Sequence, residues 1–170
     1  DKNWIAPLGE NVNEFEKAMK AYMNWGYPVA LSAGTAALHL SMILAGVQAG
    51  DKVFCQSLTF SASANPIAYL GAEPVFIDSD RESWNMDPVA LEKAFEMYPE
   101  VKLVVSAELY GFPGRMDIIK KICEKHGALL VEDAAEAMGA TLNGKQCGSF
   151  GDYSAVSYNG NKIITGSSGG

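Results

Sequence analysis

Cysteine and histidine are scarce in this chain. Three cysteines, Cys55, Cys123 and Cys147, and two histidines, His39 and His126, are spread over 170 residues. The cysteines are odd in number, lie far apart and form no Cys-x-x-Cys pair, so the sequence does not encode a disulfide framework. With so few histidines beside them, a zinc site is also disfavoured. We therefore expect a reduced, cytoplasmic protein without a metal centre.

Positive charge and long apolar runs are lacking as well. The chain has 13 Lys and Arg against 20 Asp and Glu, a net charge of -7. This balance offers no basic field for nucleic acid. No apolar run approaches the ~20 residues that cross a bilayer, and the first residues do not resemble a signal peptide. With 48% hydrophobic residues, the sequence instead predicts one folded domain with a sizeable core and no nucleic-acid or membrane partner.

Apolar segments with strand and helix signals alternate along the chain. The predicted strands cover 28–33, 52–59, 73–78, 102–107, 128–131 and 152–158, and the predicted helices cover 11–24, 34–44, 61–70, 87–98 and 117–126. Asn143-Gly144 is the strongest hairpin signal. Because helices separate strands that are mostly apolar, we predict an α/β fold with a mostly parallel sheet and helices on both faces.

Ligands of open parallel sheets bind at the carboxyl ends of the strands. Gly34-Thr35 follows the first predicted strand and opens a helix, where backbone N–H groups could hold an anion. The same pair also fits an ordinary helix N-cap. No Gly-x-Gly-x-x-Gly follows a strand, and the segment from Gly139 to Gly144-Lys145-Gln146 lacks the Ser or Thr of a P-loop. A standard nucleotide-phosphate motif is therefore absent.

Three further residues after predicted strands each allow two interpretations. Asp133 either caps the following helix or pairs with a protonated ring nitrogen. Phe60 belongs to the core or stacks on a planar ligand, and Lys162 is a surface charge or a lysine that forms a Schiff base. Taken together with a phosphate-binding turn, they describe a pyridoxal phosphate (PLP) pocket.

Segments along essentially the whole chain resemble one known family. The segments 4–9, 32–40, 58–60, 71–78, 109–111, 132–139 and 157–165 look like motifs of the DegT/DnrJ/EryC1/StrS sugar aminotransferases. The resemblance implies the fold of the large domain of type I PLP-dependent transferases, the aspartate aminotransferase fold. It is closest to the branch that makes 4-amino sugars from nucleotide-linked 4-keto-6-deoxyhexoses.

The resemblance also implies a role for each candidate site residue. Lys162 would form the Schiff base with pyridoxal 5'-phosphate and then move the proton between substrate and cofactor carbons. Asp133 would keep the pyridine nitrogen protonated. Glu136 falls near the ring hydroxyl, where many members carry Gln or His. Phe60 would stack on the ring, and the phosphate would be held by Gly34, Thr35 and Ser157.

The reaction implied by the resemblance is transfer of an amino group from glutamate to a nucleotide-linked keto-deoxysugar, at carbon 4, within a homodimer. Such a reaction would serve amino sugar and polysaccharide biosynthesis. Some relatives lack the lysine and catalyse dehydration, and Lys162 argues against that chemistry here. Two alternatives stay open: a related PLP enzyme with another ketone substrate or lyase chemistry, and a non-catalytic α/β ligand-binding module.

Compared with the longer chains of this family, residues 1–170 resemble an incomplete large domain. We expect a partial PLP-binding domain without the C-terminal small domain. The glycine-rich segment 166–170 would begin a further strand, antiparallel and lying between the first and last predicted strands.

Overall fold

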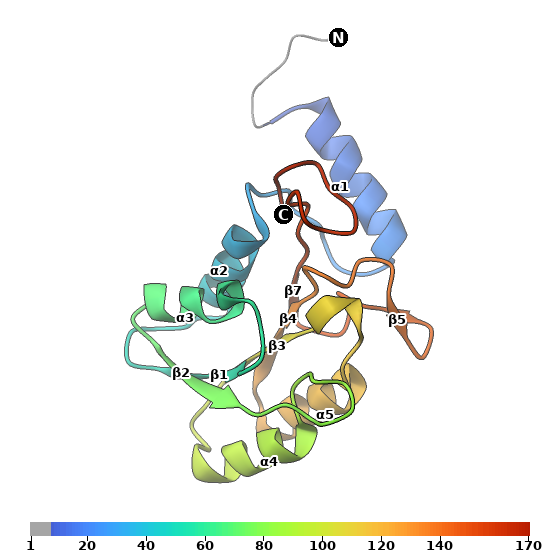
Figure 1. The fold of residues 1–170 in the computed structure, drawn as a ribbon. Helices are drawn as coiled ribbons and strands as arrows, with labels where there is room; N and C mark the ends of the chain where they lie inside the picture. Colours follow the sequence, from blue (N-terminus) through green and yellow to red (C-terminus); the bar gives the residue numbers. More distant parts are fainter. Residues whose placement is uncertain (1–7) are drawn as a thin grey trace.

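The computed structural model describes residues 8–170, so most of the family-like segment 4–9 lies outside the described residues (Figure 1). A five-stranded sheet in the order β2-β1-β3-β4-β7 forms the centre. All its neighbouring strands are parallel, which confirms the predicted α/β class. The strands are β1 (Lys52–Gln56), β2 (Glu73–Ile77), β3 (Leu103–Ala107), β4 (Leu129–Asp133) and β7 (Tyr153–Ala155).

Helices cover both faces of this sheet (Figure 1). On β3, Val104 packs into a core with α4 (Pro88–Met97) and α5 (Met116–His126). The next residue, Val105, packs into a second core with α2 (Gly34–Leu44) and α3 (Asn65–Tyr69). The two apolar layers explain why the central strands read as continuous apolar runs rather than alternating ones.

Helix ends follow the local signals. The Asp87 carboxylate accepts a hydrogen bond from Val89 N at 2.9 Å, and Pro88 occupies the first turn of α4. Gly127 ends α5 in the left-handed region, with φ 65°. The N-terminal helix α1 (Glu10–Met23) ends at Asn24, also left-handed. The helices predicted at 11–24, 87–98 and 117–126 are therefore confirmed within one or two residues.

The predicted strand 28–33 is wrong. Ala33 forms only an isolated parallel bridge with Gly169, and Leu31 exchanges backbone hydrogen bonds with Gly170. A short apolar run becomes a strand only when a partner supplies a ladder, and among the described residues only this short contact is present. The carbonyl of Gly169 also accepts a hydrogen bond from Tyr158 N, so Gly169 lies between the first and last predicted strands, as expected for the segment 166–170. The bridge from Gly169 to Ala33 is parallel, however, and not antiparallel as predicted.

Other boundaries also differ from the prediction. The helix expected at 61–70 is split into a 3-10 turn, η1 (Ser61–Ser63), and α3, with Pro66 in the first turn of α3. Proline has no N–H to continue a hydrogen-bond ladder, so a new helix begins around it. The strands predicted at 52–59 and 152–158 end at Gln56 and Ala155. The remaining residues of the two predicted strands, 57–59 and 156–158, lie in loops that border the site.

The Asn143-Gly144 hairpin is confirmed. It joins β5 (Thr141–Leu142) to β6 (Lys145–Gln146), which pair antiparallel. Both turn residues have positive φ, 53° and 78°, as the favoured two-residue hairpin turn requires.

The three cysteines are unpaired and buried. No helix within residues 8–170 is long and apolar enough to span a bilayer. The same residues contain no cluster of His, Cys, Asp and Glu suited to a metal ion.

Candidate cofactor site

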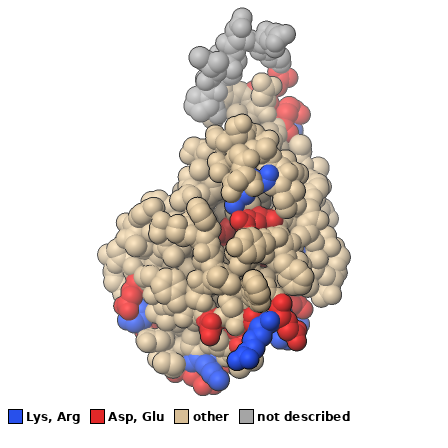
Figure 2. Space-filling model, viewed as in Figure 1, with Lys and Arg blue, Asp and Glu red and all other residues tan. Residues whose placement is uncertain are grey.

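A cavity of about 260 Å³ opens at the carboxyl edge of the sheet. Figure 2 shows a hollow in which basic and acidic side chains lie next to one another, while the surface around it carries few charges. The loops after β1, β3, β4 and β7 and the start of α2 form its walls. Its lining includes every predicted site residue, namely Gly34, Thr35, Phe60, Asp133, Glu136, Ser157 and Lys162.

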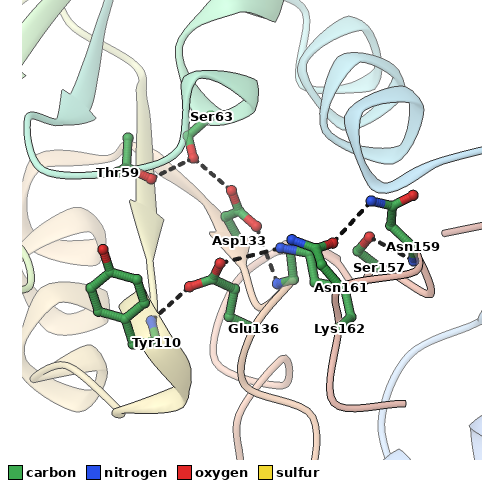
Figure 3. Close-up of polar contacts among 10 residues, drawn as sticks. Thr59, Ser63, Tyr110, Asp133, Glu136, Ser157, Asn159, Asn161 and Lys162 are labelled. Carbon is green, nitrogen blue, oxygen red and sulfur yellow. Dashed lines mark hydrogen bonds and ion pairs between the residues drawn. The ribbon is translucent and has the colours of Figure 1, made fainter. Parts of the chain in front are cut away.

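Asp133 ends β4 and lies at the base of the cavity, 6% exposed. Its Oδ2 accepts from Ser63 Oγ at 2.6 Å, and its Oδ1 accepts from Ala135 N at 3.2 Å (Figure 3). Burial raises the pKa of this carboxyl, and the Ser63 hydrogen bond is the largest effect that opposes the rise. No helix begins directly after β4, so the N-cap interpretation of Asp133 is wrong.

Sequence reasoning missed Ser63. Its side chain is fully buried and also lies 2.8 Å from Thr59 Oγ1. The sequence carries only a weak signal, a polar residue flanked by Ala62 and Ala64, and the burial of Ser63 is known from the structure. Such a residue needs a partner inside the fold.

Lys162 also lines the cavity and is mostly buried, its side chain 12% exposed. Its Nζ donates to Glu136 Oε1 at 3.2 Å and lies 5.9 Å from the centre of the Phe60 ring. Phe60 itself is exposed, which excludes the core interpretation. The amine therefore faces the cavity between a carboxylate and an aromatic face, not open solvent.

Glu136 also joins Lys162 to the turn after β3. Its Oε2 accepts from Tyr110 N at 2.7 Å, and Tyr110 has a left-handed backbone, φ 56° (Figure 3). The next residue, Gly111, has φ 76°, and a Cβ there would lie 2.8 Å from the Glu136 carbonyl oxygen. The family-like segment 109–111, the turn η2 (Leu109–Gly111), is thus shaped around Glu136.

The start of α2 is arranged for an anion. Its N-cap is Ala33, and no side chain of the described residues caps the helix, so the interpretation of Thr35 as an ordinary N-cap is wrong. Gly34 and Thr35 of the first turn line the cavity, and the N–H groups of a first turn have no intrahelical partner. A Cβ on Gly34 would lie 2.9 Å from Ser157 Cβ, so glycine lets the helix approach the Ser157 hydroxyl.

Two further carboxyls lie next to the site: Glu108 lines the cavity, and Glu132 does not. Glu132 is fully buried and accepts backbone hydrogen bonds from Gly148, Phe150 and Gly151 at 2.5, 2.6 and 2.9 Å. Glu108 lies beside it, and burial, followed by the charge of Glu132, raises the pKa of Glu108 to about 9. The donors on Glu132 favour its charged form, so the proton of this pair is held by Glu108.

These residues fit pyridoxal phosphate. A buried carboxylate suits a cationic ring nitrogen, because that charge would offset the burial that raises the pKa of Asp133. A mostly buried amine, an exposed aromatic ring and an uncapped helix N-terminus supply the other contacts that this cofactor needs.

Comparison with known proteins agrees with this geometry. The chain is 49% identical to EpsN of Bacillus subtilis over 99% of this chain and 44% of EpsN. It is 43% identical to a GDP-perosamine synthase of Caulobacter vibrioides over 100% of this chain and 45% of that protein. The PLP-form of Spr1654 from Streptococcus pneumoniae superposes with a TM-score of 0.91 at 28% identity, covering 99% of this chain and 46% of that one.

The chain thus spans less than half the length of the relatives it matches. The DegT/DnrJ/EryC1/StrS aminotransferase family matches residues 1–170. Relatives of this kind include PLP-dependent sugar aminotransferases. With its fold, cavity and sequence in agreement, the chain belongs to the DegT/DnrJ/EryC1/StrS aminotransferase family.

Proposed function

We propose that the full-length protein is a PLP-dependent aminotransferase that moves an amino group from glutamate to carbon 4 of a nucleotide-linked keto-deoxysugar. The observation that carries this proposal is that the Lys162 amine and the Asp133 carboxylate line one cavity with the N-terminus of α2. The similarity to a GDP-perosamine synthase supports a nucleotide-linked sugar as the acceptor.

Bound pyridoxal phosphate would supply an aldehyde that bonds to amines and a ring that accepts electrons. The N–H groups of Gly34 and Thr35 and the Ser157 hydroxyl would hold its phosphate, and Phe60 would cover one ring face. Asp133 would hold the proton on the ring nitrogen. These contacts orient the reacting carbons before any bond changes.

Lys162 Nζ would be the acid and base of the reaction. Once displaced by the amine of the donor, it could take a proton from the donor carbon that carries this amine and deliver it to the cofactor carbon on the other side of the nitrogen, two bonds away. Glu136, 3.2 Å from Nζ, directs the amine toward the interior of the cavity. With the keto sugar as second substrate the same proton transfer runs in reverse.

We further place residues 1–170 in the large cofactor-binding domain of a cytoplasmic homodimer. The matched relatives are more than twice as long as this chain, which supports a second, smaller domain in the full-length protein.

Borohydride trapping tests the role of Lys162. The full-length protein is mixed with pyridoxal phosphate and reduced, and the labelled peptide is identified by mass spectrometry. We expect one label on Lys162, lost in Lys162→Arg and kept in the control Lys145→Arg, whose amine lies over the Phe150 ring instead. Labels scattered over surface lysines in the wild type would overturn the assignment.

The reaction type is tested with ¹⁵N-glutamate and a GDP-linked 4-keto-6-deoxyhexose. Amino transfer places ¹⁵N on the sugar and releases 2-oxoglutarate. Loss of the sugar 3-hydroxyl without ¹⁵N uptake would instead identify the lyase alternative.

A further inference from the structure

A short line of hydroxyl groups leads from the loop after β1 to the carboxylate at the end of β4 (Figure 3). Thr59 Oγ1 lies 2.8 Å from Ser63 Oγ, and Ser63 Oγ lies 2.6 Å from Asp133 Oδ2. Ser63 is fully buried and Asp133 nearly so. Ser63 thus reaches a residue 70 positions away rather than the backbone of its own turn.

The direction of these hydrogen bonds follows from chemistry. An ionised carboxylate only accepts, so Ser63 must donate its single proton to Asp133. The oxygen of Ser63 can then only accept from Thr59, whose hydroxyl is the donor. The Ser63 hydroxyl thus donates to Asp133 and accepts from Thr59, and these two contacts fix its orientation.

The energetic effect of this line falls on Asp133. Burial disfavours its charge, whereas the Ser63 hydroxyl, the Ala135 N–H and the positive charge of Lys162 favour it, in that order of size. Glu136 acts against the charge. Among these contacts, the hydrogen bond from the Ser63 hydroxyl therefore contributes most to keeping Asp133 in its charged form.

We propose that Ser63 is a positioning residue that holds Asp133 ionised and aimed at the ring nitrogen of the cofactor, with Thr59 setting the direction of the Ser63 hydroxyl. This inference rests on the proposed function. It assigns to Thr59 and Ser63 a part in the reaction that does not require contact with the cofactor.

The test compares two ligands in one variant. Binding of pyridoxal phosphate and of its 1-deaza analogue, in which C–H replaces the ring nitrogen, is measured by fluorescence titration of the full-length protein. We expect Ser63→Ala to weaken pyridoxal phosphate binding about tenfold, since charge-assisted hydrogen bonds are the stronger kind. Binding of the deaza analogue should change less than about twofold, because the contact from Asp133 to the ring nitrogen is missing there.

Two more variants complete the test. Ser63→Thr keeps the hydroxyl and should restore the preference for the ring nitrogen, and Ser61→Ala, an exposed serine of the same turn, should leave both affinities unchanged. A loss in Ser63→Ala that is equal for both ligands would show a merely structural role and overturn the inference alone. A wild-type protein that binds no pyridoxal phosphate at Lys162 would overturn the proposed function, and this inference with it.

Discussion

Glu132 and Asp133 are neighbours on β4, yet their carboxylates lie on opposite faces of the sheet. Register pairs Glu132 with Ser106 and Asp133 with Ala107, so one side chain enters the α4–α5 layer and the other the α2–α3 layer. Glu132 accepts three backbone N–H groups of the 148–151 turn. Asp133 has one hydroxyl and one N–H and faces a cavity.

This difference separates a structural carboxylate from one suited to chemistry. A buried charge that is fully supplied with hydrogen bonds fixes the loop that supplies them. A buried charge with fewer partners and an adjoining cavity has capacity left for a ligand. Matched amide substitutions of the two residues should therefore affect different properties.

Asp133→Asn should give the largest effect, on activity. The amide cannot stabilise a charge on the ring nitrogen, and we expect kcat to fall about 10²- to 10³-fold. The free energy of unfolding of the unloaded protein should change by less than about 1 kcal/mol, because the amide removes a buried charge. Steady-state kinetics and urea unfolding measure the two, and a stability loss as large as that of Glu132→Gln would erase the contrast.

Glu132→Gln should act mainly on stability. Its amide N–H₂ group meets backbone N–H donors of the 148–151 turn, so we expect a loss of about 2 to 3 kcal/mol in the free energy of unfolding. Urea denaturation of the unloaded protein measures it. Wild-type stability in this variant would mean that the turn does not depend on the carboxylate.

Glu108→Gln sharpens the contrast through pH. The pKa of Glu108 is raised to about 9 in the fold and lies near 4.3 in an unfolded chain. Between these values only the folded state holds the proton, so stability falls as pH rises and is fully present only below the lower value. From pH 6 to 8 we expect the wild type to lose about 1 to 3 kcal/mol through this group, and the variant to lose correspondingly less.

Urea unfolding at several pH values measures this loss. The matched control is Glu124→Gln on α5, a mostly exposed carboxylate. Equal pH slopes in wild type and Glu108→Gln would contradict the assignment of the proton to Glu108.

Glu136→Gln should give the smallest change. The amide oxygen can still accept from Tyr110 N, but the ion pair with Lys162 is lost. We expect kcat to fall about tenfold, with little change in KM, because Nζ is less well oriented. Glu136→Ala removes both contacts, and a fall equal to that of the amide variant would show that the Tyr110 contact adds nothing.

Local signals predicted most of the fold. Asp87-Pro88, Gly127 and Asn143-Gly144 act through their own backbone preferences, so the elements they bound could be located from sequence. The segment 28–33 could not, because a strand depends on a partner that local residues do not specify. The candidate site was predictable as a set, since parallel strands bring their carboxyl ends to one edge.

Ser63 and the separation of Glu132 from Asp133 were not predictable in the same way. Ser63 finds its acceptor 70 residues away, which local sequence cannot show. The sequence also does not distinguish the carboxylates of Glu132 and Asp133, because the face of the sheet on which each lies is known only once β4 is placed in the sheet. The candidate roles of Lys162, Asp133 and Glu136 in catalysis stay predictions that the variants above test.

By itself, the sequence determined the alternation of helices and strands, their caps and turns, and the family to which the chain belongs, because these follow from short-range preferences and motifs. The tertiary structure alone decided which side chains meet: Ser63 with Asp133, Lys162 with Glu136, and Glu132 with the 148–151 turn. The physical reason is that burial and long-range hydrogen bonding, which set the charge of each carboxyl, exist only once distant segments are packed together.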